Sequence, residues 1–217
     1  MLIKKYSAIR LVLCLTFCFH SSILDTFDDH DGFAEHSQFD YRQVGSGPCN
    51  IPIETTSSLN QTEFIRKYAY SYPVIIRRMQ EDIANNKLFT EKCQLDAILN
   101  DYGDKYVTVS TANTYSYKKF SMKLSDYMDK HVLPYQTSND KIVPKMKYGN
   151  ETWYFFGENN HEWKSLLDLY DRPKYNLPKH EHAYSFGIAA GLTGVPFHIH
   201  GPGFAETILG RSFLIDV

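Results

Sequence analysis

The segment that decides the fold is Gly194-Val195-Pro196-Phe197-His198-Ile199-His200-Gly201-Pro202-Gly203-Phe204-Ala205-Glu206, close to the C-terminal end of the sequence. Side chains along a β-strand point alternately to its two faces. If the backbone is extended here, His198 and His200 point to the same face, and the Gly-Pro-Gly sequence behind them turns the chain. Two imidazoles with Glu206 nearby are a typical ligand set for a divalent metal. The alternative interpretation is a pair of half-buried histidines before a turn.

The sequence after this segment contains no further histidine and ends in Ser212-Phe213-Leu214-Ile215-Asp216-Val217, an apolar run that resembles the start of a strand. A metal centre normally needs three or four protein ligands, or three and a water molecule. We therefore expect this chain to carry an incomplete copy of the fold, with its last strands missing.

Residues 1–22 have the pattern of a secretory signal peptide. Basic residues, the last of them Arg10, precede an apolar run over residues 11–19, and polar residues that include two serines follow it. The run is shorter than the roughly 20 apolar residues of a membrane-spanning helix. We expect it to be cleaved, which leaves a mature chain without a membrane span. Because no clear small-x-small cleavage site is present, an uncleaved anchor is the alternative.

Two further features agree with a secretory route. Asn60 and Asn150 each begin an Asn-x-Thr glycosylation sequon. Cys49 and Cys93 are the only cysteines outside the predicted signal peptide, and such a pair in an oxidising compartment is typical of one disulfide. The alternative for these cysteines is a pair of buried free thiols.

The rest of the sequence indicates one globular domain over residues 49–217. Residues 23–48 include a run of acidic side chains and lack periodicity, so we expect a flexible linker there. The formal net charge is −2, and no stripe of lysine and arginine runs through the chain. This balance argues against nucleic acid as a partner.

Hydrophobic periodicity predicts alternating helices and strands, which make an α+β domain that is mainly β. Asn60, with Glu63 three residues later, resembles a capping box at the start of a helix. Further helices are expected over 91–101, 124–132 and 162–170. Strands are expected over 72–77, 105–111, 152–156, 183–189 and from 195 onward.

Four stretches, in this order along the chain, resemble the Jumonji-C (JmjC) domain family: Ser110–Tyr117, Tyr154–Gly157, Ala183–Ile188 and Gly194–Gly203. The resemblance covers roughly Cys49 to Arg211. It implies a double-stranded β-helix, which is a cupin-like jelly roll, with helical additions on its N-terminal side. It also implies a lumenal protein of the endoplasmic reticulum.

Many members of the JmjC family are Fe(II)- and 2-oxoglutarate-dependent oxygenases, whose metal is held by a His-x-Asp/Glu pair and a distant histidine. By this resemblance His198 matches the first ligand, and His200 stands where the carboxylate belongs. Val195 replaces the Ser or Thr that holds the cosubstrate, and it cannot form a side-chain hydrogen bond. Ser212 follows Gly210-Arg211 where the catalytic branch often has a lysine. We therefore expect no catalytic residue in this chain.

Three functions stay open at this point. The first is a lumenal JmjC protein that is not catalytic and acts through protein partners in quality control or signalling. The second is a hydroxylase in a full-length form, which uses His198, His200 and a later histidine. The third is a cupin-like protein that binds Fe(II) or another divalent metal through both histidines and Glu206. A further pair, His180 and His182, is expected to be an exposed surface pair.

Overall fold

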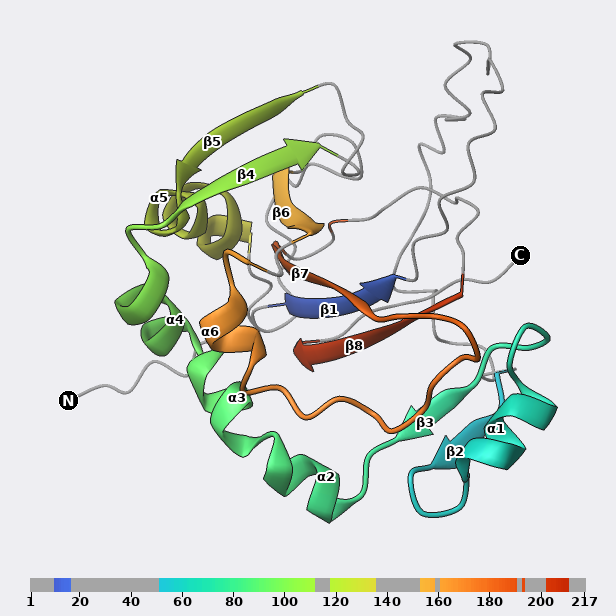
Figure 1. Ribbon diagram of the computed structural model, residues 1–217. Coiled ribbons are helices and arrows are strands. Elements are labelled where there is room, and N and C mark those ends of the chain that lie inside the picture. Colours follow the sequence, from blue (N-terminus) through green and yellow to red (C-terminus); the bar gives the residue numbers. More distant parts are fainter. Residues whose placement is uncertain are drawn as a thin grey trace, which may run out of the picture.

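The structure, a computed structural model, describes residues 10–16, 51–111, 118–135, 153–158, 161–190, 193 and 202–210. The described strands form a six-stranded sheet in the order β5-β4-β6-β7-β1-β8 and a two-stranded sheet of β2 and β3 (Figure 1). The strands are β1 (Arg10–Thr16), β2 (Ile53–Thr55), β3 (Ile75–Arg77), β4 (Tyr106–Thr111), β5 (Lys119–Lys123), β6 (Trp153–Glu158), β7 (Ala183–Ala189) and β8 (Gly203–Leu209). All neighbours in the larger sheet are antiparallel, whereas β2 and β3 are parallel.

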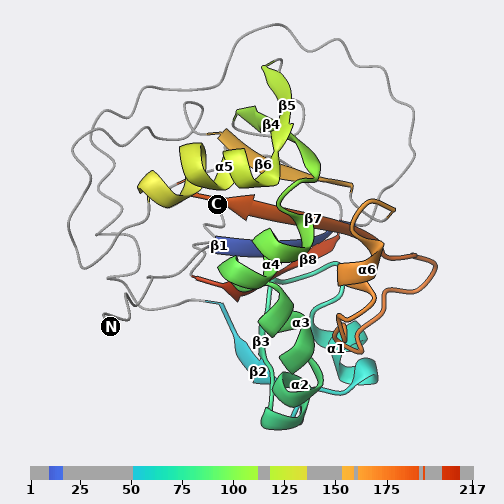
Figure 2. The same ribbon diagram turned by 90° about the vertical axis from the view of Figure 1, so that its left-hand side faces the viewer.

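Short helices form an arc beside the larger sheet, as Figures 1 and 2 show from two directions. They are α1 (Gln61–Lys67), α2 (Gln80–Asn85), α3 (Lys87–Lys92), α4 (Leu95–Tyr102), α5 (Leu124–Tyr127), the π-helix η1 (Met128–Val132), the 3₁₀-helix η2 (Leu133–Tyr135) and α6 (Lys164–Leu167). The predicted α+β mixture of helices and strands is confirmed. The strands among the described residues form an open sheet and not the closed barrel that the resemblance implies.

One predicted helix start is found in the structure for the predicted reason, and the end of α4 has a local cause of its own. The side chain of Asn60 accepts a hydrogen bond of 2.9 Å from the backbone N–H of Glu63, which caps α1. Gly103 follows the last residue of α4 and donates its N–H to the carbonyl oxygen of Leu99 over 2.8 Å. A Cβ atom at Gly103 would lie 2.4 Å from that oxygen, so the close approach requires glycine.

Two of the sequence predictions are wrong in part. The helix expected over 91–101 is divided between α3 and α4, because the backbone of Gln94 is extended and interrupts the helical turn. The strand expected over 72–77 is reduced to β3, in which Ile75 is 38% exposed. The small two-stranded sheet covers its own faces poorly, so an apolar sequence does not ensure burial there.

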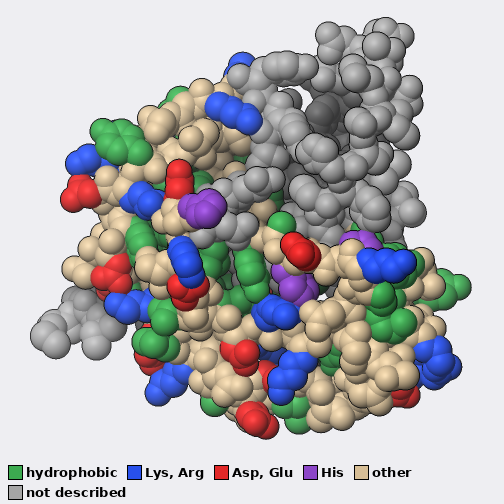
Figure 3. Space-filling model, viewed as in Figure 1, with side chains coloured by type: hydrophobic (Ala, Val, Ile, Leu, Met, Phe, Trp, Pro, Cys, Tyr) green, Lys and Arg blue, Asp and Glu red, His purple; other side chains and the backbone are tan. Residues whose placement is uncertain are grey.

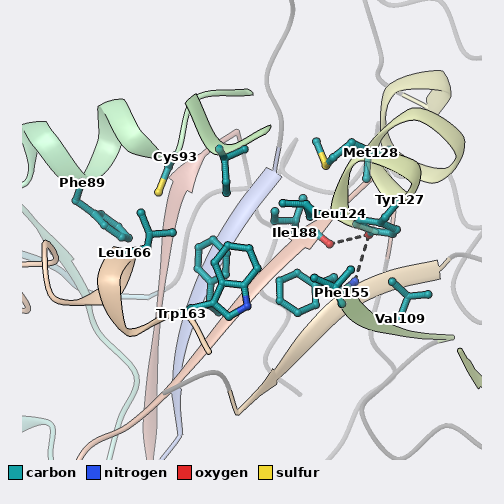
Figure 4. Close-up of a cluster of buried hydrophobic side chains, with 14 of the residues drawn as sticks. Phe89, Cys93, Val109, Leu124, Tyr127, Met128, Phe155, Trp163, Leu166 and Ile188 are labelled. Atoms are coloured by element: carbon teal, nitrogen blue, oxygen red, sulfur yellow. Dashed lines mark hydrogen bonds between the residues drawn. The ribbon is translucent and has the colours of Figure 1, made fainter. Parts of the chain in front are cut away.

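The core lies between the large sheet and the helices. Figure 4 shows Trp163 beside Phe155, and the ring of Trp163 also lies 5.0 Å from that of Phe186. Phe155, Trp163 and Phe186 are all buried. Phe156 and Trp153 are half-buried, and Trp153 packs against the same cluster. Phe155 of β6 thus belongs to the core, whereas Trp153 and Phe156 of the same strand are only partly covered.

Strand β1 comes from the segment that we predict to be a signal peptide. It lies between β7 and β8 and pairs with both. Nothing in the structure tests whether this segment is cleaved, so the signal peptide stays a prediction. The predicted linker over 23–48 lies outside the described residues. Within the described part of the chain, no helix is long and apolar enough to cross a bilayer.

The hydroxyl of Tyr127 is a buried polar group that joins β6 to β7. It lies 2.7 Å from the carbonyl oxygen of Ile188 and 3.2 Å from that of Trp153, and it accepts a hydrogen bond of 3.2 Å from the N–H of Phe155 (Figure 4). Phe155 and Ile188 are paired residues of the β6–β7 ladder. Burial raises the pKa of Tyr127 well above its ordinary value, so the phenol keeps its proton and remains a donor.

We predict that Tyr127→Phe lowers the free energy of unfolding by about 1–3 kcal/mol. The ring still fills its place, but the N–H of Phe155 and the carbonyl of Ile188 lose a buried partner. Urea denaturation measures the change. Tyr106→Phe is the matched control, because Tyr106 is 63% exposed and its hydroxyl should matter by less than about 0.5 kcal/mol. Equal losses in both variants would show that the Tyr127 hydroxyl has no special role.

Candidate functional site

Of the three predicted metal ligands, only Glu206 lies in the described part of the chain. It belongs to β8, the strand at one edge of the large sheet. His198 and His200 lie outside the described residues. Within the described ranges, no three His, Cys, Asp or Glu side chains are close enough together to hold a metal ion. The metal site therefore stays a prediction that depends on the two histidines.

Glu206 is held by a cation and a phenol. Its Oε2 atom accepts a hydrogen bond of 2.7 Å from Nη2 of Arg78 and one of 2.5 Å from the hydroxyl of Tyr170. The side chains of Arg78 and Glu206 are 14% and 23% exposed, so the ion pair is shielded from much of the solvent. We call Arg78, Tyr170 and Glu206 the Arg78 cluster.

The guanidinium of Arg78 is fixed by more than its charge partner. Nη1 and Nη2 each donate to the carbonyl oxygen of Asp171 over 3.0 Å, and the guanidinium carbon lies 5.5 Å from the centre of the Tyr170 ring. The side chain of Asn86 pairs with the backbone N–H and C=O of the same Asp171. The cluster therefore ties the loop after α6 to α2 and α3 on one side and to β8 on the other.

The electrostatics of the cluster keep the guanidinium of Arg78 charged and the phenol of Tyr170 neutral. Burial alone lowers the pKa of Arg78, but the hydrogen bond and the charge of Glu206 outweigh it and raise that pKa overall. Burial raises the pKa of Tyr170 far above its ordinary value, and the charge of Glu206 adds to this. Tyr170 is thus a neutral donor to a carboxylate whose charge Arg78 balances.

This arrangement limits what Glu206 can do chemically. To bind a metal ion, its carboxylate would share or leave its bonds with Arg78 and Tyr170. Breaking a fully buried ion pair costs about 3–5 kcal/mol when one charge is left without a partner, and the cost is smaller for this half-buried pair. The structure thus gives Glu206 a structural role, which weakens the prediction of Glu206 as a third metal ligand.

His180 and His182 differ from the exposed surface pair that the sequence predicts, because both are half-buried. Nδ1 of His180 lies 2.7 Å from the carbonyl oxygen of Pro178 and 3.0 Å from the hydroxyl of Tyr70. His182 hydrogen-bonds to Arg172 and to Oδ1 of Asn176. Burial, and then the charge of Arg172, lower the pKa of His182. Local loop contacts bury these rings.

The remaining predicted sites are described only in part. Asn60 is exposed, as a glycan acceptor must be, whereas Asn150 lies outside the described residues. Cys93 is a free thiol that is 1% exposed, and burial raises its pKa to about 12. Cys49 also lies outside the described residues, so the Cys49–Cys93 disulfide stays a prediction.

Arg78 and Tyr170 are site residues that the sequence does not reveal. Arg78 follows β3 and is 128 residues from Glu206 in the sequence, so no local spacing connects them. On the face shown in Figure 3, lysine and arginine side chains are mixed with aspartate and glutamate and do not gather by sign. The described residues on that face therefore form no single charged patch that could serve as a binding surface.

Comparison with known proteins gives the family. No family model and no solved structure matches the chain. The human protein named JmjC domain-containing protein 8 is 40% identical to it over 161 residues, which are 74% of this chain and 56% of the relative. The mouse protein of the same name is 39% identical over 161 residues, 74% of this chain and 55% of that relative. The chain thus spans about half the length of these relatives. With this identity over most of its own length, the chain belongs to the JmjC domain-containing family.

Proposed function

We propose that this chain is a lumenal JmjC-domain protein of the endoplasmic reticulum that does not catalyse oxygenation and acts through contacts with other proteins. The observation that carries the proposal is the state of Glu206. Of the predicted metal ligands it is the only carboxylate, and its Oε2 atom is bonded to Arg78 and Tyr170. The signal-like N-terminus and the two sequons support the compartment.

A ferrous oxygenase site needs two histidines and a carboxylate, with open positions for substrate and oxygen. In this chain His200 stands at the carboxylate position, which removes a negative charge from the ligand set. Glu206 does not replace it easily, because Arg78 would then remain as a half-buried cation without its partner. Imidazole is still a good ligand, so weak binding of a divalent metal by His198 and His200 is compatible with the proposal.

The cosubstrate side is altered as well. A 2-oxoglutarate carboxylate is held by hydroxyl or cationic side chains, which make strong charge-assisted hydrogen bonds. Val195 offers no such donor, and Ser212 offers a hydroxyl in place of a lysine charge. Loss of metal charge and of cosubstrate contacts in one chain favours a role in protein binding over catalysis.

A second candidate is a hydroxylase formed by the complete protein. It is favoured by one fact, that the matched relatives are nearly twice as long as the matched region. A further histidine and further strands in that additional sequence would supply what the oxygenase site needs. The cupin-like metal protein is disfavoured, because it requires Glu206 to be available.

We predict that the purified chain, supplied with Fe(II), ascorbate and 2-oxoglutarate, releases succinate at the rate of the protein-free reaction. His198→Ala is the control, and it should behave like the unchanged chain because no turnover depends on the histidine. Succinate is measured by mass spectrometry. Turnover that is present in the unchanged chain and absent in His198→Ala would contradict the non-catalytic proposal.

We predict that any divalent metal binding depends on the histidines and not on Glu206. In calorimetric titrations with Co²⁺, His198→Ala and His200→Ala should each abolish the weak binding. Glu206→Gln should leave it unchanged, because that carboxylate is bonded to Arg78 and Tyr170. His182→Ala, in a different loop, is the control variant. A loss of affinity in Glu206→Gln, with an unchanged circular dichroism spectrum, would favour the cupin-like alternative.

We predict that the chain made in a secretory cell carries glycans at Asn60 and Asn150 and gains gel mobility in two steps on partial deglycosylation. Thr62→Ala should remove one step while it leaves the Asn60 cap of α1 in place. Asn60→Gln would also remove the cap, which costs about 1 kcal/mol, so Thr62→Ala is the cleaner variant. Identical mobility before and after complete deglycosylation would argue against a lumenal compartment.

A further inference from the structure

Strand β1 occupies an interior position of the sheet although it comes from the N-terminal apolar segment. It is antiparallel to β7 from Arg10, opposite Ala189, to Thr16, opposite Ala183. On its other side it is antiparallel to β8, with Thr16 opposite Gly203, and the register shifts once near Leu11. Both backbone edges of β1 are therefore used in pairing (Figure 1).

Strand β8 depends on β1 for its place in the sheet. It is the last strand in the order, and β1 is its pairing partner among the described strands. Neighbouring strands lie about 4.8 Å apart, so without β1 a gap of roughly 10 Å would separate β7 from β8. That distance is too great for the two strands to bond to each other. Apart from β1, the described contacts of β8 are the Arg78 cluster, through Glu206, and the packing of Ile208 and Leu209 against the core.

The sequence of β1 suits a position with neighbours on both sides. Residues 11–15 are apolar without interruption, Leu-Val-Leu-Cys-Leu. An uninterrupted apolar sequence is the pattern of strands in the interior of a sheet. A strand of this composition pairs through its backbone and needs no specific polar contact.

We propose that the position between β7 and β8 is a binding site for an extended apolar peptide, and that Arg10–Thr16 of this chain is its resident ligand. The site recognises the backbone of an antiparallel strand of apolar sequence. Cleavage of the predicted signal peptide would remove the resident strand from the polypeptide. The edges of β7 and β8 would then be open to another segment of the same chemistry.

Disulfide trapping in the full chain tests whether β1 occupies the site in the stated register. Cys14 of β1 lies opposite Ala205 of β8 and opposite Ser185 of β7. In a Cys18→Ser background with oxidised glutathione, Ala205→Cys should form a disulfide with Cys14, found by peptide mapping without reduction. Phe204→Cys is the matched control, because a shift of one residue places the thiol on the other face.

Ser185→Cys tests the pairing of β1 with β7 in the same way. It keeps the register testable if Ala205→Cys fails to fold. Disulfides to Cys14 in Ala205→Cys and Ser185→Cys, with none in Phe204→Cys, support the occupied site. Disulfides in none of the three, or equally in all three, overturn it.

Strand exchange tests whether the site binds its ligand reversibly. A protease site inserted within residues 23–48 of the full chain allows the N-terminal fragment to be cut free after folding. A labelled peptide with the sequence of residues 8–18, its cysteines changed to serine, should then replace the fragment and keep the amides of β7 and β8 protected from hydrogen exchange. The same peptide with proline at position 13 should not bind, because it lacks an N–H and distorts the strand. Amides of β7 and β8 that keep full protection after the fragment has left, with no peptide bound, would overturn the proposal.

Discussion

The hydroxyl of Tyr127 is the contact on which the arrangement of the sheet depends. It bonds to Phe155 of β6 and Ile188 of β7, and these residues oppose each other in the ladder. β7 in turn pairs with β1, and β1 pairs with β8. A buried group with three backbone neighbours thus fixes the strand that positions the rest of the sheet, including the strand that carries Glu206.

The Arg78 cluster bonds β8, the last strand in the order of the large sheet, to the segment after β3. Arg78 comes from the segment after β3 and Glu206 from β8, and Tyr170 lies between them with its hydroxyl bonded to both. Because the pair is partly shielded, its charges balance each other instead of remaining available to a ligand. The bonds of Glu206 to Arg78 and Tyr170 therefore stabilise the edge strand β8, and they also make the Glu206 carboxylate less available to a metal ion.

Sequence patterns predicted well where the cause is local. The bounds of β7 agree with the predicted strand over 183–189, and Asn60 caps α1 through a contact three residues away. The prediction of one helix over 91–101 was wrong in part, because no residue type in the sequence indicates the extended backbone at Gln94 that divides it. Arg78 could not be predicted as a site residue, because its role is set by a partner that only the folded chain brings near. His198 and His200 show a second limit of sequence patterns. Their spacing predicts that both side chains lie on one face of a strand, but it does not identify the groups that would contact them there.

The segment Arg10–Thr16 shows why one sequence pattern supports two structures. A short apolar run after basic residues satisfies the requirements of a signal peptide, and the same run satisfies those of an interior strand. A signal peptide and an interior strand both favour apolar side chains, so the hydrophobicity of a segment cannot distinguish the two. The distinction comes from the backbone, because a strand between β7 and β8 meets two edges that would otherwise have unpaired N–H and C=O groups. The fate of this segment after synthesis therefore decides whether the sheet keeps an occupied interior position or presents two open edges to another chain.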